Sequence, residues 1–592
     1  KRTPWHFEEN KNNETALFNI NELVTTSLAI RDFFGVEIDI EWAVDLDDNL
    51  KILQARPITA LSGKSEERRM IAEELARLNK NYPSDTLWDG ATFAEWSGPP
   101  SELTFSIWKK AFAKGQAFST SLKKLGYLGI DQELTNDTHS LLEKIFDRPF
   151  INVSMIAPLY FGPIPYHLED KNGPKLKFDF RKMTLKMFLL TPLTIYRMIK
   201  ISLQLSTQRH KWLTDCSKEL SDFSKKSFRV GDINYYKNFS DEKLFSAFKE
   251  ESDNFYSSHL VWPLVLASLI QSTTLSLQSL LKSLMTDKEI EQKINHWLGI
   301  GLHSITMDMN QEYAEACIDV DKHTHFLSKY GHRGPGELEL SNPRWIEMGN
   351  SIFFKLNSKP LNAALEKNSV ISEIRGLKTY KMQVIEKEWL LLSEMLELRE
   401  KWKMNLLSPY SHIRFMALEI AKRYNVGIDI FWFSVDEILS KKFDLDLAHK
   451  RKNHVEISKS IYLPSMVSLS SLEQVLSNKE SRKDKKVLVG EALSPGLVFG
   501  EVRVVSDPEN IDTDSWPENT ILIAESTDPG WTGLFLKSKA IVVEKGGVLS
   551  HCAIVAREMN LPAVSRIKQC HLQFRDGDKI WVDGNNGRIT LA

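Results

Sequence analysis

The chain has 592 residues, of which 42% are hydrophobic and 26% charged, and its formal net charge is −2. This length is too great for one hydrophobic core, so we expect about three domains. The near-neutral balance gives no basic field of the kind that attracts nucleic acid or an anionic membrane, and we expect neither as a partner. The four cysteines are scattered without CxxC spacing, which argues against a structural zinc site.

The apolar stretches are short compared with a membrane span. The longest of them, residues 187–195 and 260–270, fall below the roughly 20 residues that cross a bilayer as a helix. No secretory signal is visible, so we expect a cytoplasmic protein. Because the first residue is Lys1, we also expect the chain to begin inside a longer protein.

Residues 1–62 end in a strand–turn–strand pattern, with strands over 37–44 and 50–54. Gln54 and Arg56 are two residues apart and therefore share one face of the second strand, where Glu41 of the first strand could join them. A carboxylate and an amide oxygen suit Mg²⁺, and a guanidinium group suits a phosphate. The alternative is a solvated hairpin with a surface ion pair.

The middle of the chain, residues 63–476, is predicted to be mainly helical. One helix is expected over 377–402, with an apolar face made of Ile385, Trp389, Leu392 and Leu396. Residues 477–486 are too polar to pack, and we predict a linker there on which the last domain moves as a rigid body.

The last region, residues 487–592, changes to short β-rich runs separated by turns. We predict strands over 502–505, 521–524, 540–543 and 579–582 and one helix over 552–559. This pattern indicates a compact β/α domain of about 100 residues. Together the three regions predict a multidomain α+β protein.

The strongest motif is the run GGVLSHCAIVARE at 546–558, which follows a buried-looking strand. Two glycines allow a tight loop, and Ser550 is a natural N-cap for the helix that follows. His551 would then stand at the helix start, where free N–H groups and the positive end of the helix dipole favour an anion. A neutral imidazole there can attack phosphorus. The alternative is a capping histidine without chemistry.

The whole string from Gly546 to Val564 resembles the phosphohistidine signature of the PEP-utilising enzymes, a family with a swivelling domain that carries a phosphoryl group on histidine. The flanking Ser494-Pro495-Gly496 and Asp528-Pro529-Gly530-Trp531 segments match as well. This resemblance covers the entire C-terminal domain. It implies that His551 carries the phosphoryl group.

The N-terminal hairpin is similar to the last strands of the ATP-grasp domain of the same family. The resemblance implies that Glu41 and Gln54 bind Mg²⁺, that Arg56 contacts a nucleotide phosphate, and that ATP and Mg²⁺ are the cofactors. The glycine-rich phosphate loop and the adenine-binding strands have no counterpart in the sequence. We therefore expect the rest of the ATP-grasp domain to precede Lys1 in cis, and the chain alone to bind ATP weakly.

The central run YGHRGPGE at 330–337, followed by NPRW at 342–345, resembles a motif in the helical domain of rifampicin phosphotransferase-like members of the family. The segment 429–437 resembles another. The three glycines of the first run do not form a dinucleotide fingerprint, because no strand leads into them. The order of the regions also matches these members, since nothing of barrel size follows the histidine domain.

We therefore predict an ATP-dependent, dikinase-type phosphotransferase. The resemblance implies that the β-phosphoryl group of ATP passes to His551 and then to a hydroxyl group of a small-molecule acceptor. Arg333 would neutralise the transferring phosphoryl group and His332 would act as a base. Three alternatives stay open: a condensing ligase of the same architecture, as in prodigiosin-forming relatives; a phosphoenolpyruvate synthase-like protein that is inactive as truncated; and a non-catalytic interaction protein.

Overall fold

The computed structural model describes most of residues 38–591 and a few residues before them. Gaps lie at 45–49, 91–97, 128–139, 157–165, 170–174, 226–233, 302–304, 354–366 and 473–486 and at shorter places. The chain forms two compact units, residues 1–78 and 79–592. The linker predicted at 477–486 falls outside the described residues.

The first unit contains the predicted hairpin. Strands β1 (Ile38–Val44) and β2 (Leu50–Pro57) pair antiparallel, which confirms the strand–turn–strand pattern. The register places Glu41 opposite Gln54 and shifts by a bulge immediately after Glu41. Helix α2 (Thr59–Asn81) follows and runs without interruption through the boundary predicted at residue 62.

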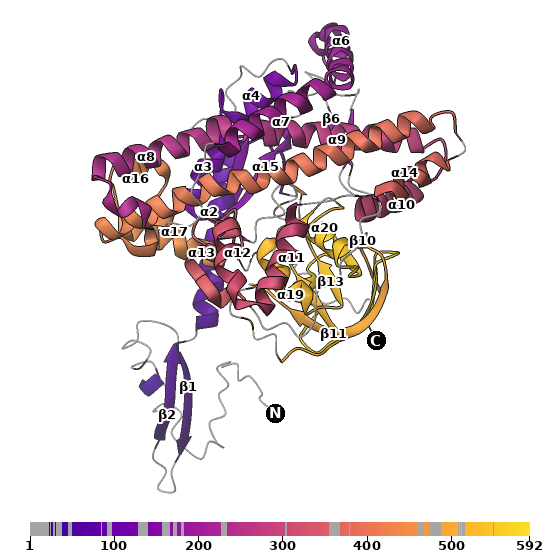
Figure 1. The fold of residues 1–592 in the computed structure, drawn as a ribbon. Coiled ribbons are helices and arrows are strands. Elements are labelled where there is room, and N and C mark those ends of the chain that lie inside the picture. The colour runs from indigo at the N-terminus through magenta and orange to yellow at the C-terminus, as the bar shows by residue number, and fades with distance from the viewer. Residues whose placement is uncertain are drawn as a thin grey trace. The chain divides into compact units, whose positions relative to one another are not determined.

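The second unit begins with a mainly helical part (Figure 1). Its helices are α3 (Glu102–Ala111), α4 (Ala117–Lys124), α6 (Leu185–Thr207), α7 (Arg209–Lys225), α8 (Asp241–Asn254), α9 (Val261–Leu281), α10 (Asp287–Gly301), α11 (Ile305–Ile318), α12 (His323–Tyr330), α13 (Trp345–Met348), α14 (Lys367–Arg375), α15 (Met382–Arg423), α16 (Val435–Leu439) and α17 (Leu445–Ser458).

This part is not purely helical, because two small sheets lie within it. Strands β3 (Leu87–Asp89), β4 (Leu142–Ile145), β5 (Arg148–Asn152) and β8 (Met466–Ser468) form a sheet of order β4-β5-β3-β8. Strands β6 (Tyr166–Glu169) and β7 (Lys175–Phe178) form a hairpin. The prediction of a mainly helical middle missed both sheets, whose strands of three to five residues are too short to show a pattern.

Helix α15 is the central element, and it packs along α9 (Figure 1). The predicted apolar face is confirmed, since all four of its side chains are at most 4% exposed. The predicted bounds are wrong: the helix begins five residues after 377 and continues to Arg423, through Pro409. The continuation was missed because residues 404–417 are buried on nearly every side and so have no polar face to mark a period.

One helical stretch among the described residues, Asp241–Leu281, is long and apolar enough to cross a membrane by length and composition. We expected the run at 260–270 to be too short to cross a membrane. It belongs to a longer apolar helical stretch, so that expectation was wrong as far as length is concerned. Half of the apolar window is buried inside the unit, and Val265, Leu266 and Leu269 have no exposed surface. These are the properties of a core helix, for which the same apolar content is needed.

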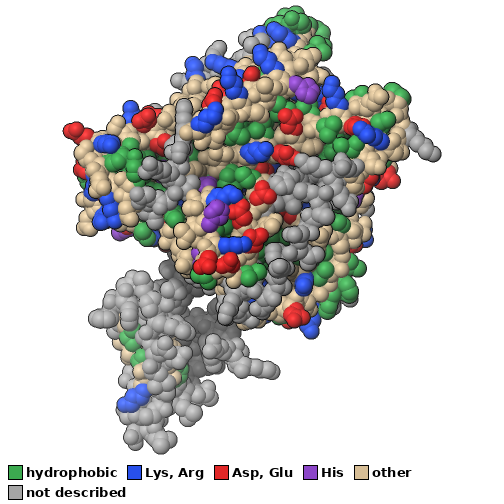
Figure 2. Space-filling model, viewed as in Figure 1, with side chains coloured by type: hydrophobic (Ala, Val, Ile, Leu, Met, Phe, Trp, Pro, Cys, Tyr) green, Lys and Arg blue, Asp and Glu red, His purple; other side chains and the backbone are tan. Residues whose placement is uncertain are grey.

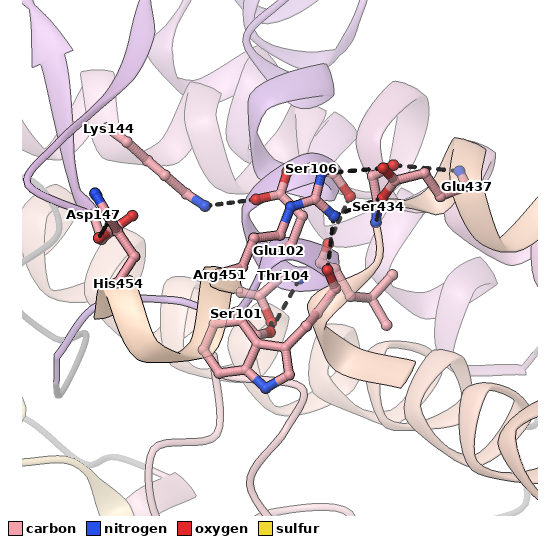
Figure 3. Close-up of polar contacts among 12 residues, drawn as sticks. Ser101, Glu102, Thr104, Ser106, Lys144, Asp147, Ser434, Glu437, Arg451 and His454 are labelled. Carbon is pink, nitrogen blue, oxygen red and sulfur yellow. Dashed lines mark hydrogen bonds and ion pairs between the residues drawn. The ribbon is translucent and has the colours of Figure 1, made fainter. Parts of the chain in front are cut away.

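The segment 429–437, which resembled a family motif, has a structural role. Ser434 and Glu437 form a capping box at the start of α16, and Glu437 also receives two hydrogen bonds from Arg451, at 2.8 and 3.0 Å. The backbone N–H of Val435 donates to Ser106 of α3 (Figure 3). These contacts join α3, α16 and α17.

The C-terminal part is a mixed eight-stranded sheet of order β10-β14-β13-β12-β11-β15-β16-β9. Its strands are β9 (Val487–Val489), β10 (Glu491–Ser494), β11 (Leu497–Val504), β12 (Thr520–Ala524), β13 (Ala540–Val543), β14 (Ala563–Ser565), β15 (Lys579–Asp583) and β16 (Arg588–Leu591). The strands predicted at 521–524, 540–543 and 579–582 are confirmed to within one residue at each end, as is the helix, α20 (His551–Glu558). The strand predicted at 502–505 exists, but β11 begins five residues earlier, so its predicted start is wrong.

The centre of this sheet is buried on both faces. Leu522 and Val543 face a core that includes α20, whereas Ile521 and Val542 face a second core with α21 (Cys570–Gln573). Neighbouring residues of a strand point to opposite faces, so a parallel strand covered on both sides must be apolar throughout. The sheet therefore holds the loop after β13, and the histidine that it carries, on a rigid base.

Candidate functional site

His551 is the first residue of α20, directly after the loop that follows β13. The loop between them turns through Gly546, which has a φ of 127° that favours glycine. Ser550 is the N-cap, and its hydroxyl accepts a hydrogen bond from the N–H of Ala553 at 3.4 Å, as predicted. His551 is the first helical residue, so its backbone belongs to the amide-rich, positive end of α20.

The imidazole of His551 is only 6% exposed. It lies nearly parallel to the ring of Phe535 in α19 (Thr532–Leu536), with ring centroids 6.0 Å apart and an interplanar angle of 24°. At the other end of α20, Arg557 donates to the carbonyls of Leu493 and Val548, both at 2.7 Å. Burial lowers the pKa of Arg557 to about 10. These contacts fix the ring and its helix.

The run 330–337 forms a buried loop that begins at the end of α12. Gly331 and Gly334 leave no room for a side chain, because a Cβ on Gly334 would lie 2.6 Å from the carbonyl oxygen of Pro343. A helix rather than a strand precedes the loop, which confirms that it is no dinucleotide fingerprint. Arg333 forms a bidentate ion pair with Glu337, and each side chain is 2% exposed.

His332 is also buried in this loop, and its Nε2–H donates to the carbonyl of Met404 at 3.1 Å. Burial, followed by the charge of Arg333, lowers the pKa of His332 to about 3. The ring is therefore neutral at pH 7 and a weak proton acceptor. The guanidinium group of Arg333 is already paired with Glu337. The acceptor-site roles predicted for His332 and Arg333 thus stay predictions. In the structure both side chains hold the loop, His332 through Met404 and Arg333 through Glu337.

Contacts join the histidine-bearing part to this loop. Asp528 accepts hydrogen bonds from the N–H of Gly336 at 2.9 Å and from the N–H of Gly530 at 2.8 Å. Thr532 donates to the side-chain oxygen of Asn310 in α11 at 3.0 Å. A Cβ on Gly530 would overlap Pro335 of the loop, so the two backbones meet directly.

The electrostatics of this interface involve His551 itself. Burial, followed by the charge of Glu337, raises the pKa of Asp528 to about 7. Burial opposes ionisation of Glu337, but Arg333, Lys403 and His551 together lower its pKa below the ordinary value. Lys403 Nζ lies 3.6 Å from Glu337 Oε1. Charges from both the helical part and the histidine-bearing part therefore act on Glu337.

Sequence reasoning missed Glu337, Asp528 and Lys403 as members of this site. Glu337 ends the GHRGPGE run and Asp528 begins the DPGW segment, so both were visible only as parts of family motifs. Their burial is what calls for a partner, and it is a property of the fold that the sequence does not show. Lys403 lies in the part of α15 beyond the helix predicted to end at 402, and nothing in the sequence marks it.

The three N-terminal candidates lie in the first unit. Glu41 and Gln54 are directly opposed, and Arg56 follows two residues later on β2. Glu41 and Gln54 supply a carboxylate and an amide oxygen, and Arg56 supplies a guanidinium group, which are the donor types that Mg²⁺ and a nucleotide phosphate need. The register therefore fits the predicted set, whose side chains lie outside the described residues.

Three family models match parts of this chain. The family model for the PEP-utilising enzyme mobile domain matches residues 516–587, which include His551. The model for the AMP/ATP-binding domain of pyruvate phosphate dikinase matches residues 3–77, which include the hairpin and continue beyond the boundary predicted at 62. The model for the fourth domain of rifampicin phosphotransferase matches residues 312–353, which include the GHRGPGE loop.

Curated relatives agree with these matches. A rifampicin phosphotransferase of Bacillus cereus is 28% identical over 296 residues, which are 45% of this chain and 34% of that protein. A probable phosphoenolpyruvate synthase of Staphylothermus marinus is 31% identical over 175 residues, or 29% of this chain and 20% of that protein. A prodigiosin synthesizing transferase of Serratia marcescens is 25% identical over 295 residues, or 45% and 33%.

The chain thus matches about a third or less of the length of these curated relatives. The N-terminal, central and C-terminal matches nevertheless all lead to one group of proteins, and each falls on residues that the geometry singles out. Together they support the PEP-utilising enzymes as the family of this chain.

Proposed function

We propose that the complete protein is an ATP-dependent phosphotransferase that passes a phosphoryl group through His551 to a hydroxyl group of a small molecule held by the helical part of the second unit. The observation that carries this proposal is the position of His551. It stands at the amide-rich end of α20, in the part of the chain that contacts the loop of the helical part through the hydrogen bond between Asp528 and Gly336.

MgATP, when bound, supplies the phosphoryl group, and Glu41, Gln54 and Arg56 are the residues of this chain that would hold it. The imidazole of His551 would contribute a nitrogen lone pair that forms an N–P bond to the β-phosphorus, while the bond from that phosphorus to the oxygen bridging the α- and β-phosphates breaks and AMP leaves. Water would take the γ-phosphoryl group, which leaves as inorganic phosphate. The N–H groups at the start of α20 stabilise the three phosphoryl oxygens through hydrogen bonds and the helix dipole. The ring of Phe535 lies nearly parallel to the imidazole beside it.

Delivery to the acceptor breaks the N–P bond and forms an O–P bond, and the lone pair returns to the ring nitrogen of His551. The proton of the acceptor hydroxyl must pass to a base. Asp528 is our candidate, because its pKa of about 7 lets it accept a proton at neutral pH. Arg333 and Lys403 keep Glu337 ionised beside it.

A second candidate function is a condensing ligase, which the likeness to the prodigiosin synthesizing transferase favours. Both functions need the same phosphohistidine, so the product decides between them. A phosphorylated acceptor supports the phosphotransferase. Release of inorganic phosphate together with a new bond between two organic substrates supports the ligase.

The test is transfer of label from ATP labelled at the β-phosphate to the full-length protein in the presence of Mg²⁺. We expect acid-labile label in the wild type and in a His571→Ala control, which removes another histidine of the same sheet domain. We expect none in His551→Ala. Label that persists in His551→Ala contradicts the proposal, as does a wild type that takes up no label.

A further inference from the structure

Helix α6 exposes an apolar stripe to solvent along most of its length. Leu185, Phe188, Leu189, Tyr196, Ile199 and Leu203 follow one another at i, i+3, i+4, i+11, i+14 and i+18, which places them on one face of an α-helix. Each of these side chains is 55% to 76% exposed. Contiguous apolar surface of this kind is rare on a soluble protein and marks an interaction site.

The C-terminal end of α6 is attached to the rest of the second unit. Ile201 is buried, and Leu205 packs against the core that contains Trp212 and Leu213 of α7. Arg209, the first residue of α7, is held by an ion pair with Glu388 of α15. The stripe is therefore presented outward by a helix whose last turns are fixed. It is not an exposed remnant of the core.

The charges around the stripe are of one sign. Residues 181–214 contain seven lysines and arginines and no aspartate or glutamate, in a chain whose net charge is −2. Arg197 and Lys200 are exposed, and among the described residues neither has an acidic partner within ion-pair distance. Figure 2 shows hydrophobic side chains beside lysine and arginine side chains over the part of this face where Figure 1 places α6.

We propose that α6 is a membrane-surface helix, which lies in the headgroup layer of an anionic bilayer with its apolar stripe turned toward the acyl chains. A helix with apolar residues on one face and only basic charges beside them is the pattern of an interfacial helix. The basic side chains then contact lipid phosphates. This role is independent of the phosphotransfer proposed above.

Charge complementarity selects this occupant over a second copy of the chain. Pairing of two α6 helices about a two-fold axis would place two acid-free basic segments together, where they repel one another. A bilayer with anionic lipids supplies both the apolar layer and the opposite charge. Our expectation of no membrane partner rested on the net charge of the whole chain, in which this segment is averaged away.

The experiment is flotation of the purified chain with vesicles of phosphatidylcholine alone or of phosphatidylcholine mixed with phosphatidylglycerol. We expect binding to the mixed vesicles that weakens as salt is raised. The double variant Leu189→Glu/Ile199→Glu should lose it. Leu275→Glu, at a 59% exposed position of α9, is the matched control and should bind as the wild type does.

Charge reversal separates the two components of binding. Arg197→Glu/Lys200→Glu should reduce partitioning at least about thirtyfold, because each basic residue near an anionic surface contributes about 1 kcal/mol. Circular dichroism of each variant shows that it is folded. The proposal is overturned if the wild type ignores the mixed vesicles or binds both kinds equally. It is also overturned if the stripe variants only convert an oligomer to a monomer in light scattering.

Discussion

The carboxylate of Asp528 accepts a hydrogen bond from the backbone N–H of Gly336, a residue 192 positions earlier in the chain, at 2.9 Å. The other oxygen of the same carboxylate accepts from Gly530, at 2.8 Å. One buried side chain thus joins the loop of the helical part to the loop that precedes α19. The histidine-bearing part and the helical part meet at this contact, so it is the first place to test the site.

Replacement of Asp528 with Asn should change how stability depends on pH. The folded protein holds the pKa of Asp528 near 7, above its ordinary value of 3.8. The folded state therefore favours the protonated form, and the contribution of Asp528 to stability falls as pH rises through this window. Asn does not titrate. The melting temperature of Asp528→Asn minus that of the wild type should increase over the same window, as measured by calorimetry.

Asp446→Asn, at an exposed position of α17, controls for the loss of an aspartate as such. Its difference from the wild type should stay nearly constant over the window. If the difference for Asp528→Asn is constant as well, burial does not raise the pKa of Asp528, and Asp528 is no candidate for the base.

Replacement of Gly530 with Ala should separate the two parts of the site without unfolding either. The new Cβ would lie 2.8 Å from N and Cβ of Pro335 and nearer still to its Cα, so the two loops cannot meet as they do. The N–H of Gly336 then loses its partner and should exchange with solvent faster. Hydrogen exchange read by mass spectrometry measures this, with β13 as an internal reference that stays protected.

Gly376→Ala is the control for that experiment. Its Cβ would meet only carbonyl oxygens of its own helix end, at 3.3 Å or more. We expect no change at Gly336 in this variant. Equal exchange in Gly530→Ala and the wild type would mean that the contact between Gly530 and Pro335 does not hold the two loops together.

Removal of the cap of α20 should weaken the histidine site. Ser550→Ala deletes the hydroxyl that accepts the N–H of Ala553 and should cost about 1 kcal/mol of stability. The first turn of α20 should fray, so phosphorylation of His551 should slow more than unfolding alone explains. Ser224→Ala, at an exposed position of α7, should change neither quantity. Unchanged labelling in a destabilised Ser550→Ala would show that the cap has a structural role only.

Glu388→Gln should destabilise the helical part strongly. Arg209 donates to both oxygens of Glu388, at 2.7 and 2.8 Å, and the two side chains are about a tenth exposed. The variant leaves the guanidinium buried without a counter-charge, which costs about 3–5 kcal/mol. Glu386→Gln, which breaks the exposed pair with Arg375, should have little effect. The urea midpoints of the two variants can be compared by tryptophan fluorescence. Equal midpoints would contradict the prediction that the buried Arg209 needs Glu388 as its counter-charge.

Sequence predicted this protein best where the cause of a structure lies within a few residues of its effect. The capping role of Ser550 depends on the next three residues, and the apolar face of α15 at 385–396 depends on a helical period. Successive side chains of β12 and β13 point into two different cores, but both cores are apolar, so the sequence shows no alternation of polar and apolar residues. The length of the apolar runs and the turns beside them were enough to predict these strands.

The rest of the site depends on distant partners. Nothing near Arg333 in the sequence shows that Met404 and Lys403 of α15 lie beside its loop, because the helix that brings them has no polar face in that region. The low pKa of His332 likewise comes from burial, which the sequence of a glycine-rich loop does not reveal. The net charge of the whole chain cannot show such local features either, since it averages the basic segment around Lys200 with acidic residues elsewhere. The expectation of no membrane partner, which rested on that net charge, stays a prediction.

Arg557 has a consequence for the kinetics of the protein. It ties α20 to the carbonyl of Val548, in the loop before His551, and to the carbonyl of Leu493 in β10. His551, the first turn of α20 and the edge strand β10 are therefore held together as one piece. In the phosphotransfer that we propose, this piece would reach a new surface with its site already formed. The time between two productive encounters would then be set by diffusion of the whole C-terminal part and not by refolding of its loop.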